Sequence, residues 1–351
     1  MNFASDNVTG AAPEILAAIA AANEGAAMPY GNDPLTKRLA AAFEAVFERA
    51  VMAFPVATGS AANSLALACM TPPYGAIYCH PESHINTDEC GAPELFSGGA
   101  KLVPIPGDGG KIAARDFAAV LARAGQGVVH HVQPAAISLT NQSEAGTFYR
   151  PDEIRAIAEI AHAHGVYVHV DGARFANVVA ALNHSPAELT WRAGVDALSF
   201  GATKNGALAA EAVVFFEPKL AESFGYRRKR GGHLFSKMRF VSAQLEAYLK
   251  DDLWLRHARH ANAMAKRLAD GLATIARVEL LFPVEGNEIF ARLPDAAIKG
   301  AFAEGYYFYR LHGEPDETCR LVTAFNTKLA DVDGLLDSLR RHAGGARRKR
   351  A

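Results

Sequence analysis

The chain has 351 residues, of which 50% are hydrophobic and 21% are charged, and its formal net charge at pH 7 is −1. This composition is that of an ordinary globular protein, and the charge balance leaves no overall field to attract nucleic acid or an anionic membrane. Because a single core rarely grows beyond about 250–300 residues, we expect a large domain followed by a smaller one.

The first two thirds of the chain alternate predicted helices and strands. Helices at 13–24 and 34–50 begin with proline and precede a buried strand at 51–57, which leads directly into another helix. Further strands follow at 76–80, 101–105, 127–133 and 166–170, with the clearest apolar helical stripe at 151–165 and a capped helix at 185–194. Two apolar strands, Asp196–Phe200 and Glu211–Phe216, complete the series. The alternation predicts an α/β fold with a mostly parallel central sheet and helices on both faces.

After about residue 232 the pattern changes to one long, nearly continuous helical region. Short strands at 278–282, 288–293 and 320–325 follow it, with helices at 296–304 and 331–342. We therefore expect a smaller C-terminal α+β domain. The predicted parts are an N-terminal arm (1–12), the large domain (13–245), the small domain (246–344) and a disordered basic tail (345–351).

Several classes of protein are excluded by what the sequence lacks. No apolar run approaches the roughly 20 residues needed to span a bilayer, and the first residues lack the layout of a signal peptide. The four cysteines show no CxxC spacing, which favours reduced thiols in the cytoplasm, and we expect no metal site. Basic runs at 226–232 and 347–350 are typical of solvated faces or tails, so we expect no nucleic-acid partner.

Polar residues directly after the predicted strands are the candidates for a site, because ligands bind at the carboxyl ends of parallel strands. Gly59 and Ser60 open a helix whose free N–H groups suit a phosphate, although an ordinary serine-capped joint would look the same. Asp171 is either an acceptor on the floor of a pocket or a helix cap paired with Arg174. Lys204 is either a nucleophilic amine in a partly desolvated site or a lysine that reaches the surface.

Taken together, these three features match what pyridoxal 5'-phosphate requires of a protein. A lysine forms a Schiff base with the cofactor, a carboxylate keeps the ring nitrogen protonated, and a helix N-terminus binds the phosphate. A dinucleotide-dependent oxidoreductase would also alternate strands and helices. However, the chain has no GxGxxG fingerprint after the first strand, and that alternative leaves Lys204 unexplained.

The sequence resembles the low-specificity L-threonine aldolase family, within the aspartate-aminotransferase-like fold (fold type I) of pyridoxal phosphate enzymes. The resemblance spans almost the whole chain and is most specific in the run HVDGAR and in the lysine that follows it. The other matching segments are SDNVTGAAPEI, YGNDPLTKRL, TGSAANSLAL, ESHINTDECGAPELFSG, SFGATKNG, RRKRGGHLFSKMRF and CRLVTAF. The form GATKNG around the lysine is similar to that of bacterial enzymes that also cleave phenylserine.

The resemblance implies a role for each candidate residue. Lys204 would carry the cofactor, Asp171 would pair with its ring nitrogen, and His84 would stack on its ring and serve in catalysis. The residues implied to bind the cofactor further are Gly59, Ser60, Arg174, Thr203 and Arg230, with Lys229 beside Arg230. Those implied to hold the substrate are Ser5, Arg174 and Arg320 at its carboxylate, and Tyr30 towards a neighbouring subunit of a homodimer or homotetramer.

The chain departs from the family in one loop. Many members carry a histidine near the substrate hydroxyl in a motif E-N-T-H-N, where this sequence reads SLTNQSEAG with Asn141 at the matching place. The base that takes the β-hydroxyl proton is therefore either His84 or a bound water. His130 and His131 lie within a predicted strand, and we interpret them as structural.

The resemblance implies retro-aldol cleavage of L-threonine, L-allo-threonine or a related β-hydroxy-α-amino acid, such as phenylserine, to glycine and an aldehyde. Because one fold hosts many reactions, β-elimination or transamination of a small amino acid remains the alternative.

Overall fold

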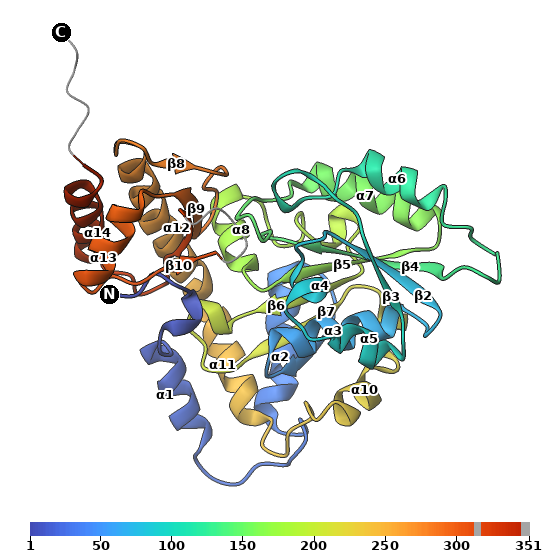
Figure 1. Ribbon diagram of the computed structural model, residues 1–351. Helices are drawn as coiled ribbons and strands as arrows, with labels where there is room; N and C mark the ends of the chain where they lie inside the picture. Colours follow the sequence, from blue (N-terminus) through green and yellow to red (C-terminus); the bar gives the residue numbers. More distant parts are fainter. Residues whose placement is uncertain (312–316, 345–351) are drawn as a thin grey trace.

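The computed structural model describes residues 1–311 and 317–344, so the predicted basic tail lies outside the described residues (Figure 1). A seven-stranded sheet forms the centre of the larger part. Its strands, in spatial order, are β1 (Met52–Val56), β7 (Glu211–Phe215), β6 (Ala197–Gly201), β5 (Tyr167–Gly172), β4 (Gln133–Thr140), β2 (Gly75–Cys79) and β3 (Lys101–Pro104). The five strands from β6 to β3 are parallel, and β7 runs antiparallel to both of its neighbours. The predicted mostly parallel sheet is thereby confirmed.

Helices cover both faces of this sheet, and alternate strand residues belong to two separate cores. Val168 and Val170 of β5 join the core under α1 (Pro13–Ala22), α2 (Pro34–Phe47), α6 (Ala114–Leu121), α7 (Pro151–Ala163), α8 (Phe175–Leu182) and α11 (Arg239–Leu249). Tyr167 packs in the opposite core, under α3 (Gly59–Met70), α4 (His84–Thr87), α5 (Ala92–Ser97), α9 (Pro218–Ala221) and α10 (Phe224–Arg230). Asp171 shares the face of Tyr167, which is therefore the face of α3.

Two helices show how the sequence fixes these positions. In α7 the buried residues are the predicted apolar stripe, and Glu153 caps the helix by accepting the Arg150 N–H at 2.7 Å. Almost every residue of α3 is buried, and because many of its side chains are small, the helix can lie close against the sheet. The hydroxyl of Thr58 accepts the Ala61 N–H at 3.2 Å and sets the start of α3 at the carboxyl edge.

The C-terminal region forms a second sheet and a third core. The antiparallel strands lie in the order β10 (Tyr309–Arg310), β11 (Thr318–Val322), β9 (Glu288–Arg292) and β8 (Glu279–Leu280). They pack with α12 (Leu253–Leu272), α13 (Asp295–Ala303) and α14 (Leu329–His342). Residues of α12 enter both the core of the large part and this one, so α12 connects them. The boundary at residues 245 and 246 stays a prediction.

The N-terminal arm belongs to this second unit in space, and Figure 1 shows the N-terminus beside β10. Phe3 is buried in the C-terminal core, its N–H donates to the Tyr307 carbonyl at 2.6 Å, and its carbonyl accepts the Val322 N–H at 2.7 Å. This anchoring brings the next residues of the arm, Ser5 and Asp6, towards the carboxyl edge of the large sheet.

Three predicted elements differ from the structure. The strand expected at 127–133 is an exposed turn up to Val132, because the Gln133 side chain binds the loop backbone at Gly127 and Val128. His130 and His131 thus lie in that turn and not in a strand. The helix expected at 185–194 forms only the short 3-10 turn Trp191–Ala193. The strand predicted as buried at 51–57 is the edge strand β1, whose start is exposed.

Among the described residues, no helix is long and apolar enough to cross a membrane. All four cysteines are free thiols.

Candidate active site

The carboxyl ends of β6, β5, β4 and β2 meet at one edge because these four strands are parallel neighbours. Asp171 lies near the end of β5, in register with Thr140 of β4 and Ser199 of β6. Lys204 follows β6 after a short connection, and His84 follows β2 in the same way. The fold thus brings the three predicted catalytic residues to a single edge of the sheet.

Asp171 is buried and fixed by two donors. Its Oδ1 accepts the Ala173 N–H at 3.0 Å, and its Oδ2 accepts a hydrogen from the Asn63 amide on α3 at 2.8 Å. Arg174 instead directs its guanidinium to Asp6, so the alternative in which Asp171 caps a helix through Arg174 does not describe the site. These two donors fix the orientation of the buried carboxyl group at the end of β5.

Lys204 lies in a 3-10 turn, Thr203–Asn205, whose backbone is held on both sides. The Asn205 amide donates to the Tyr248 hydroxyl at 2.7 Å, and Glu211 accepts the Ala202 N–H at 2.8 Å. The Lys204 amine itself is partly buried and has no hydrogen-bond or ion-pair partner within 1–311 and 317–344. A fixed loop therefore presents an amine that is free to react.

The Thr203 side chain stabilises that loop through hydrogen bonds to the backbone. Its hydroxyl donates to the Ala210 carbonyl at 3.4 Å and accepts the Ala210 N–H at 3.2 Å. Its predicted contact with a phosphate remains a prediction.

The N-terminus of α3 has the features of an anion site. Gly59 and Ser60 occupy the first helical turn, where N–H groups have no acceptor within the helix. A side chain added at Gly59 would meet nothing within 4 Å, so the space in front of the helix is open. With the helix dipole, these N–H groups suit a phosphate.

His84 is joined to two buried side chains that the sequence reasoning did not identify. Its Nδ1 lies 2.8 Å from Oε1 of Glu89, and that same oxygen accepts a hydrogen from the Asn63 amide at 2.9 Å. This hydrogen bond to Glu89 is the main cause that raises the pKa of His84 above its ordinary value. Both residues stand within the matched segments TGSAANSLAL and ESHINTDEC, but the sequence gives no local signal that the fold brings them to His84.

Arg174 and Arg320, which were predicted to share the substrate carboxylate, differ in what already holds them. Arg174 binds both carboxylate oxygens of the buried Asp6, at 2.7 and 3.0 Å, and its Nη1 lies 3.1 Å from Glu288. Arg320 donates to the Ala4 carbonyl at 3.2 Å, while its buried Nε has no partner among the residues that the structure describes. Arg320 thus offers the more available donors to an incoming carboxylate.

Ser5 lies on the segment that also contacts Arg320, and its hydroxyl caps the turn Asp6–Val8 by accepting the Asn7 N–H at 3.1 Å. Tyr30 is exposed, with the Lys229 ammonium 4.6 Å from the centre of its ring. Arg230 is also exposed, at the end of α10. The predicted roles of Tyr30 and Arg230 at a neighbouring subunit's site stay predictions.

The loop that lacks the family's histidine places a glutamate at the site instead. Asn141 is committed to the backbone of Tyr149, donating to its carbonyl at 3.2 Å and accepting its N–H at 3.1 Å. Glu144 accepts the His84 N–H at 2.8 Å and the Thr140 hydroxyl at 2.9 Å. Burial raises the pKa of Glu144 to about 7.

These residues fit pyridoxal phosphate. An unpaired lysine amine, a buried carboxylate and an open helix N-terminus lie along one edge, and the N-terminal arm that reaches Arg174 through Asp6 also contacts Arg320, whose buried Nε has no partner among the described residues. Together they match the aldehyde, ring nitrogen and phosphate of the cofactor and the carboxylate of an amino acid. The part of the chain described here holds no group of three or more residues suited to a metal ion.

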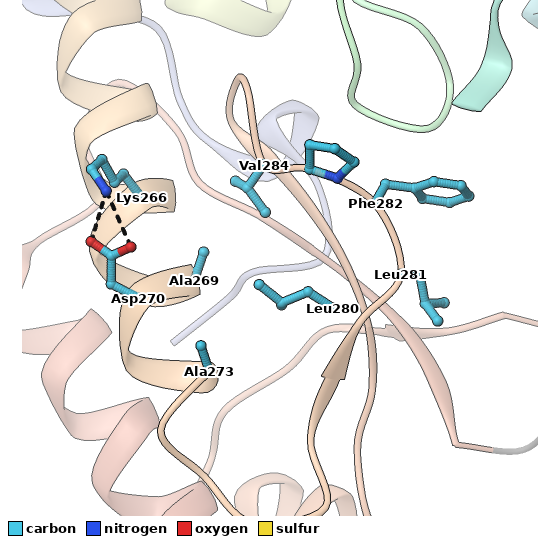
Figure 2. A pocket seen from close by; sticks show the side chains of 9 residues that line it. Lys266, Ala269, Asp270, Ala273, Leu280, Leu281, Phe282 and Val284 are labelled. Carbon is cyan, nitrogen blue, oxygen red and sulfur yellow. Dashed lines mark hydrogen bonds and ion pairs between the residues drawn. The ribbon is translucent and has the colours of Figure 1, made fainter. Parts of the chain in front are cut away.

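The surface groove shown in Figure 2 has a different character. It lies between α12 and the segment 280–284, and its charged residues, Lys266 and Asp270, pair with each other at 2.9 Å. It contains none of the residues gathered at the carboxyl edge of the sheet, so it does not compete as a catalytic centre.

Comparison with known proteins agrees with this geometry. The family model of beta-eliminating lyases matches residues 2–295. The low specificity L-threonine aldolase of Pseudomonas aeruginosa is 43% identical over 338 residues, which cover 96% of each chain. The solved structure of Leishmania major threonine aldolase has a TM-score of 0.91 and 27% identity, covering 97% of this chain and 99% of that one.

An aspartate aminotransferase of Rhodobacter sphaeroides, at 16% identity, has a TM-score of 0.69 over 97% of this chain and 92% of its own. That likeness concerns the fold alone. It confirms the predicted aspartate-aminotransferase-like architecture, with its smaller C-terminal α+β unit.

Proposed function

The chain belongs to the beta-eliminating lyase family of pyridoxal phosphate enzymes, and on this premise we propose that it cleaves β-hydroxy-α-amino acids to glycine and an aldehyde. The substrates proposed are L-threonine, L-allo-threonine and related compounds such as phenylserine. The observation that carries the proposal is the unpaired Lys204 amine on the same edge as the buried Asp171 carboxylate.

Four groups of this chain would hold the cofactor. Lys204 would bond to its aldehyde, Asp171 would keep its ring nitrogen protonated, and Gly59 and Ser60 would bind its phosphate through their N–H groups. When bound, pyridoxal phosphate supplies an aldehyde that joins the substrate amine and a protonated ring that withdraws electrons from bonds at Cα.

The chain's own contribution to the reaction begins with orientation. Arg320, with unfilled donors, would hold the substrate carboxylate, and Ser5 lies on the adjacent arm. Arg174 would act mainly by fixing Asp6 and through its remaining N–H groups. By holding the carboxylate, Arg320 would orient the bonds at Cα of the substrate and so favour cleavage of the Cα–Cβ bond.

His84 would take the proton from the β-hydroxyl group. Its ring is 40% exposed, in contrast to its buried neighbours, so it can reach a substrate. Asn141 is bound to the backbone of Tyr149 and cannot replace the family's histidine. A bound water is the alternative acceptor for this proton.

A product assay tests the proposed reaction. The purified enzyme with pyridoxal phosphate is incubated with L-threonine, L-allo-threonine and phenylserine, and glycine, aldehyde and keto acid are quantified. Glycine and aldehyde in equal amounts are expected. A keto acid in place of glycine would show that the alternative, β-elimination or transamination, is the reaction of this site.

We further propose a homodimer or homotetramer in the cytoplasm. The exposure of Tyr30 and Arg230 supports the oligomer, because both side chains are accessible to a second chain. Four free thiols support the cytoplasmic location, since disulfides are rare in reducing compartments. Light scattering measures the oligomeric state, and fractionation of the cells measures the location of the protein.

A further inference from the structure

A line of four polar side chains crosses the site from Asp171 to His84. The Asn63 amide nitrogen donates to Asp171 at 2.8 Å and to Glu89 at 2.9 Å. Glu89 in turn lies 2.8 Å from Nδ1 of His84. The amide nitrogen of asparagine carries two hydrogens, so each carboxylate receives one of them.

The line is buried everywhere except at its histidine end. The Glu89 side chain is completely buried, and Asn63 and Asp171 are buried as well. Only the His84 ring reaches solvent. Burying two carboxylates next to each other is unfavourable unless donors are shared between them, and here Asn63 is the shared donor.

The contact with Glu89 decides how His84 can act. Burial raises the pKa of Glu89 above its ordinary value, while the hydrogen bonds from His84 and Asn63 act in the opposite direction and favour its ionised form. An ionised carboxylate accepts hydrogen bonds but cannot donate one, so Nδ1 of His84 must then carry a hydrogen. In the neutral ring, Nε2 is then the nitrogen with a lone pair. No described residue is a hydrogen-bond partner of Nε2.

We propose that Glu89 is a positioning residue that fixes His84 with Nδ1–H towards the protein and Nε2 towards the substrate, and that Asn63 ties this pair to Asp171. The inference rests on the proposed function, in which His84 accepts the β-hydroxyl proton. That proton moves from the substrate oxygen to Nε2, and the resulting positive ring is stabilised by Glu89.

The charged groups around His84 agree with this arrangement. Glu89 and Asp171 favour its protonated form, and Lys204 opposes it. Glu144 faces the backbone N–H of His84 and not the ring. Glu89 is therefore the carboxylate in direct contact with the imidazole.

The first test uses the wild-type holoenzyme without substrate. Nitrogen-15 NMR of labelled histidine distinguishes the two neutral tautomers, and a His84→Gln sample assigns the signal. The expected result is hydrogen on Nδ1 in the neutral ring. Hydrogen on Nε2 instead would overturn the proposal without any need for a variant at Glu89.

The second test compares Glu89→Gln with Glu82→Gln, an exposed glutamate on the other side of α4. Glu89→Gln should lower the pKa of His84, because the carboxylate that accepts its Nδ1–H is lost, and should move the acidic limb of kcat/KM in the same direction. It should also lower kcat about 10–100-fold, while Glu82→Gln leaves all three unchanged. An unchanged pKa of His84 in folded Glu89→Gln would contradict the positioning role.

These readouts separate the inference from the proposed function. If the product assay yields no glycine, the aldolase proposal fails, and the tautomer measurement still decides whether Glu89 positions His84. If glycine forms but the tautomer is wrong, the aldolase proposal stands and the inference fails.

Discussion

The buried imidazole of His169 makes the free energy of unfolding depend on pH, and the size of this dependence can be calculated. It lies two residues before Asp171 on β5, completely buried, with Nδ1 2.9 Å from the Ser138 hydroxyl and Nε2 3.0 Å from the Ser199 hydroxyl. Burial lowers its pKa from 6.5 to about 4. The native ring is therefore neutral at pH values where the unfolded ring is already protonated.

The sign and size of the effect follow from that difference. Since the unfolded state binds more protons between pH 6.5 and about pH 4, the free energy of unfolding falls as the pH falls through this window. At 1.36 kcal/mol per pKa unit the full effect is about 3 kcal/mol, of which about 2 kcal/mol is lost between pH 7.5 and pH 5.0.

Two buried carboxyl groups act in the opposite direction. Burial raises the pKa of Glu144 and of Glu211 to about 7 from an ordinary 4.5, so their native forms bind protons as the pH falls from 7 to 4.5 and gain stability. The pH profile of the wild type alone would mix these effects. A variant that removes only the imidazole separates them.

His169→Gln is that variant, because an amide keeps hydrogen-bonding groups for the two serines but does not titrate. Urea unfolding of both holoenzymes is measured from pH 7.5 to pH 5.0 at fixed protein and cofactor concentrations. The difference in unfolding free energy between wild type and variant should shift by about 2 kcal/mol, against the wild type at low pH. A difference that stays constant with pH would refute the reasoning.

Three further substitutions test the candidate active site and the packing of the strand next to it. Asp171→Asn should lower kcat by about 100-fold or more, because the charge facing the ring nitrogen is lost, while the urea midpoint stays near that of the wild type. Arg320→Lys should lower kcat/KM about 10-fold, mainly through KM, because an ammonium cannot bind a carboxylate with two parallel hydrogen bonds. Gly201→Ala should lower the free energy of unfolding by about 2 kcal/mol or more, because its Cβ would lie 2.3 Å from the Ala173 carbonyl oxygen.

Each of these has a result that would contradict it. Wild-type kinetics in Asp171→Asn would show that Asp171 does not interact with the ring nitrogen of the cofactor. An unchanged KM in Arg320→Lys would indicate that the substrate carboxylate binds Arg174 and not Arg320. A Gly201→Ala protein with an unchanged urea midpoint would mean that β6 and the Ala173 segment can separate easily.

The sequence predicted the elements that local patterns determine. The apolar stripe of α7 and the strands β6 and β7 appear within a residue or two of their predicted bounds, because periodicity and burial alone define them. The edge position of β1 was not predictable, since an apolar run has the same appearance at the edge and in the centre of a sheet. The apolar pattern predicts Val128 and Val129 as strand residues, whereas the Gln133 side-chain amide binds the Val128 carbonyl and both valines lie in an exposed turn.

The same distinction applies to the site. Lys204, Asp171 and Gly59 could be identified because each follows a strand, and the carboxyl edge of a parallel sheet gathers such residues. Asn63 and Glu89 could not, because their role depends on how α3 packs over the end of β5 and meets the segment after α4. The pairing of Arg174 with Asp6 was hidden for the same reason, since the two residues are 168 positions apart.

The most direct test of the account concerns Lys204. The holoenzyme is treated with borohydride, which makes the bond between a lysine and the cofactor permanent, and its peptides are analysed by mass spectrometry. The account predicts a phosphopyridoxyl group on the peptide that contains Lys204, and its loss in Lys204→Ala together with the absorbance above about 400 nm. A modification on another lysine, or none in an active enzyme, would contradict it.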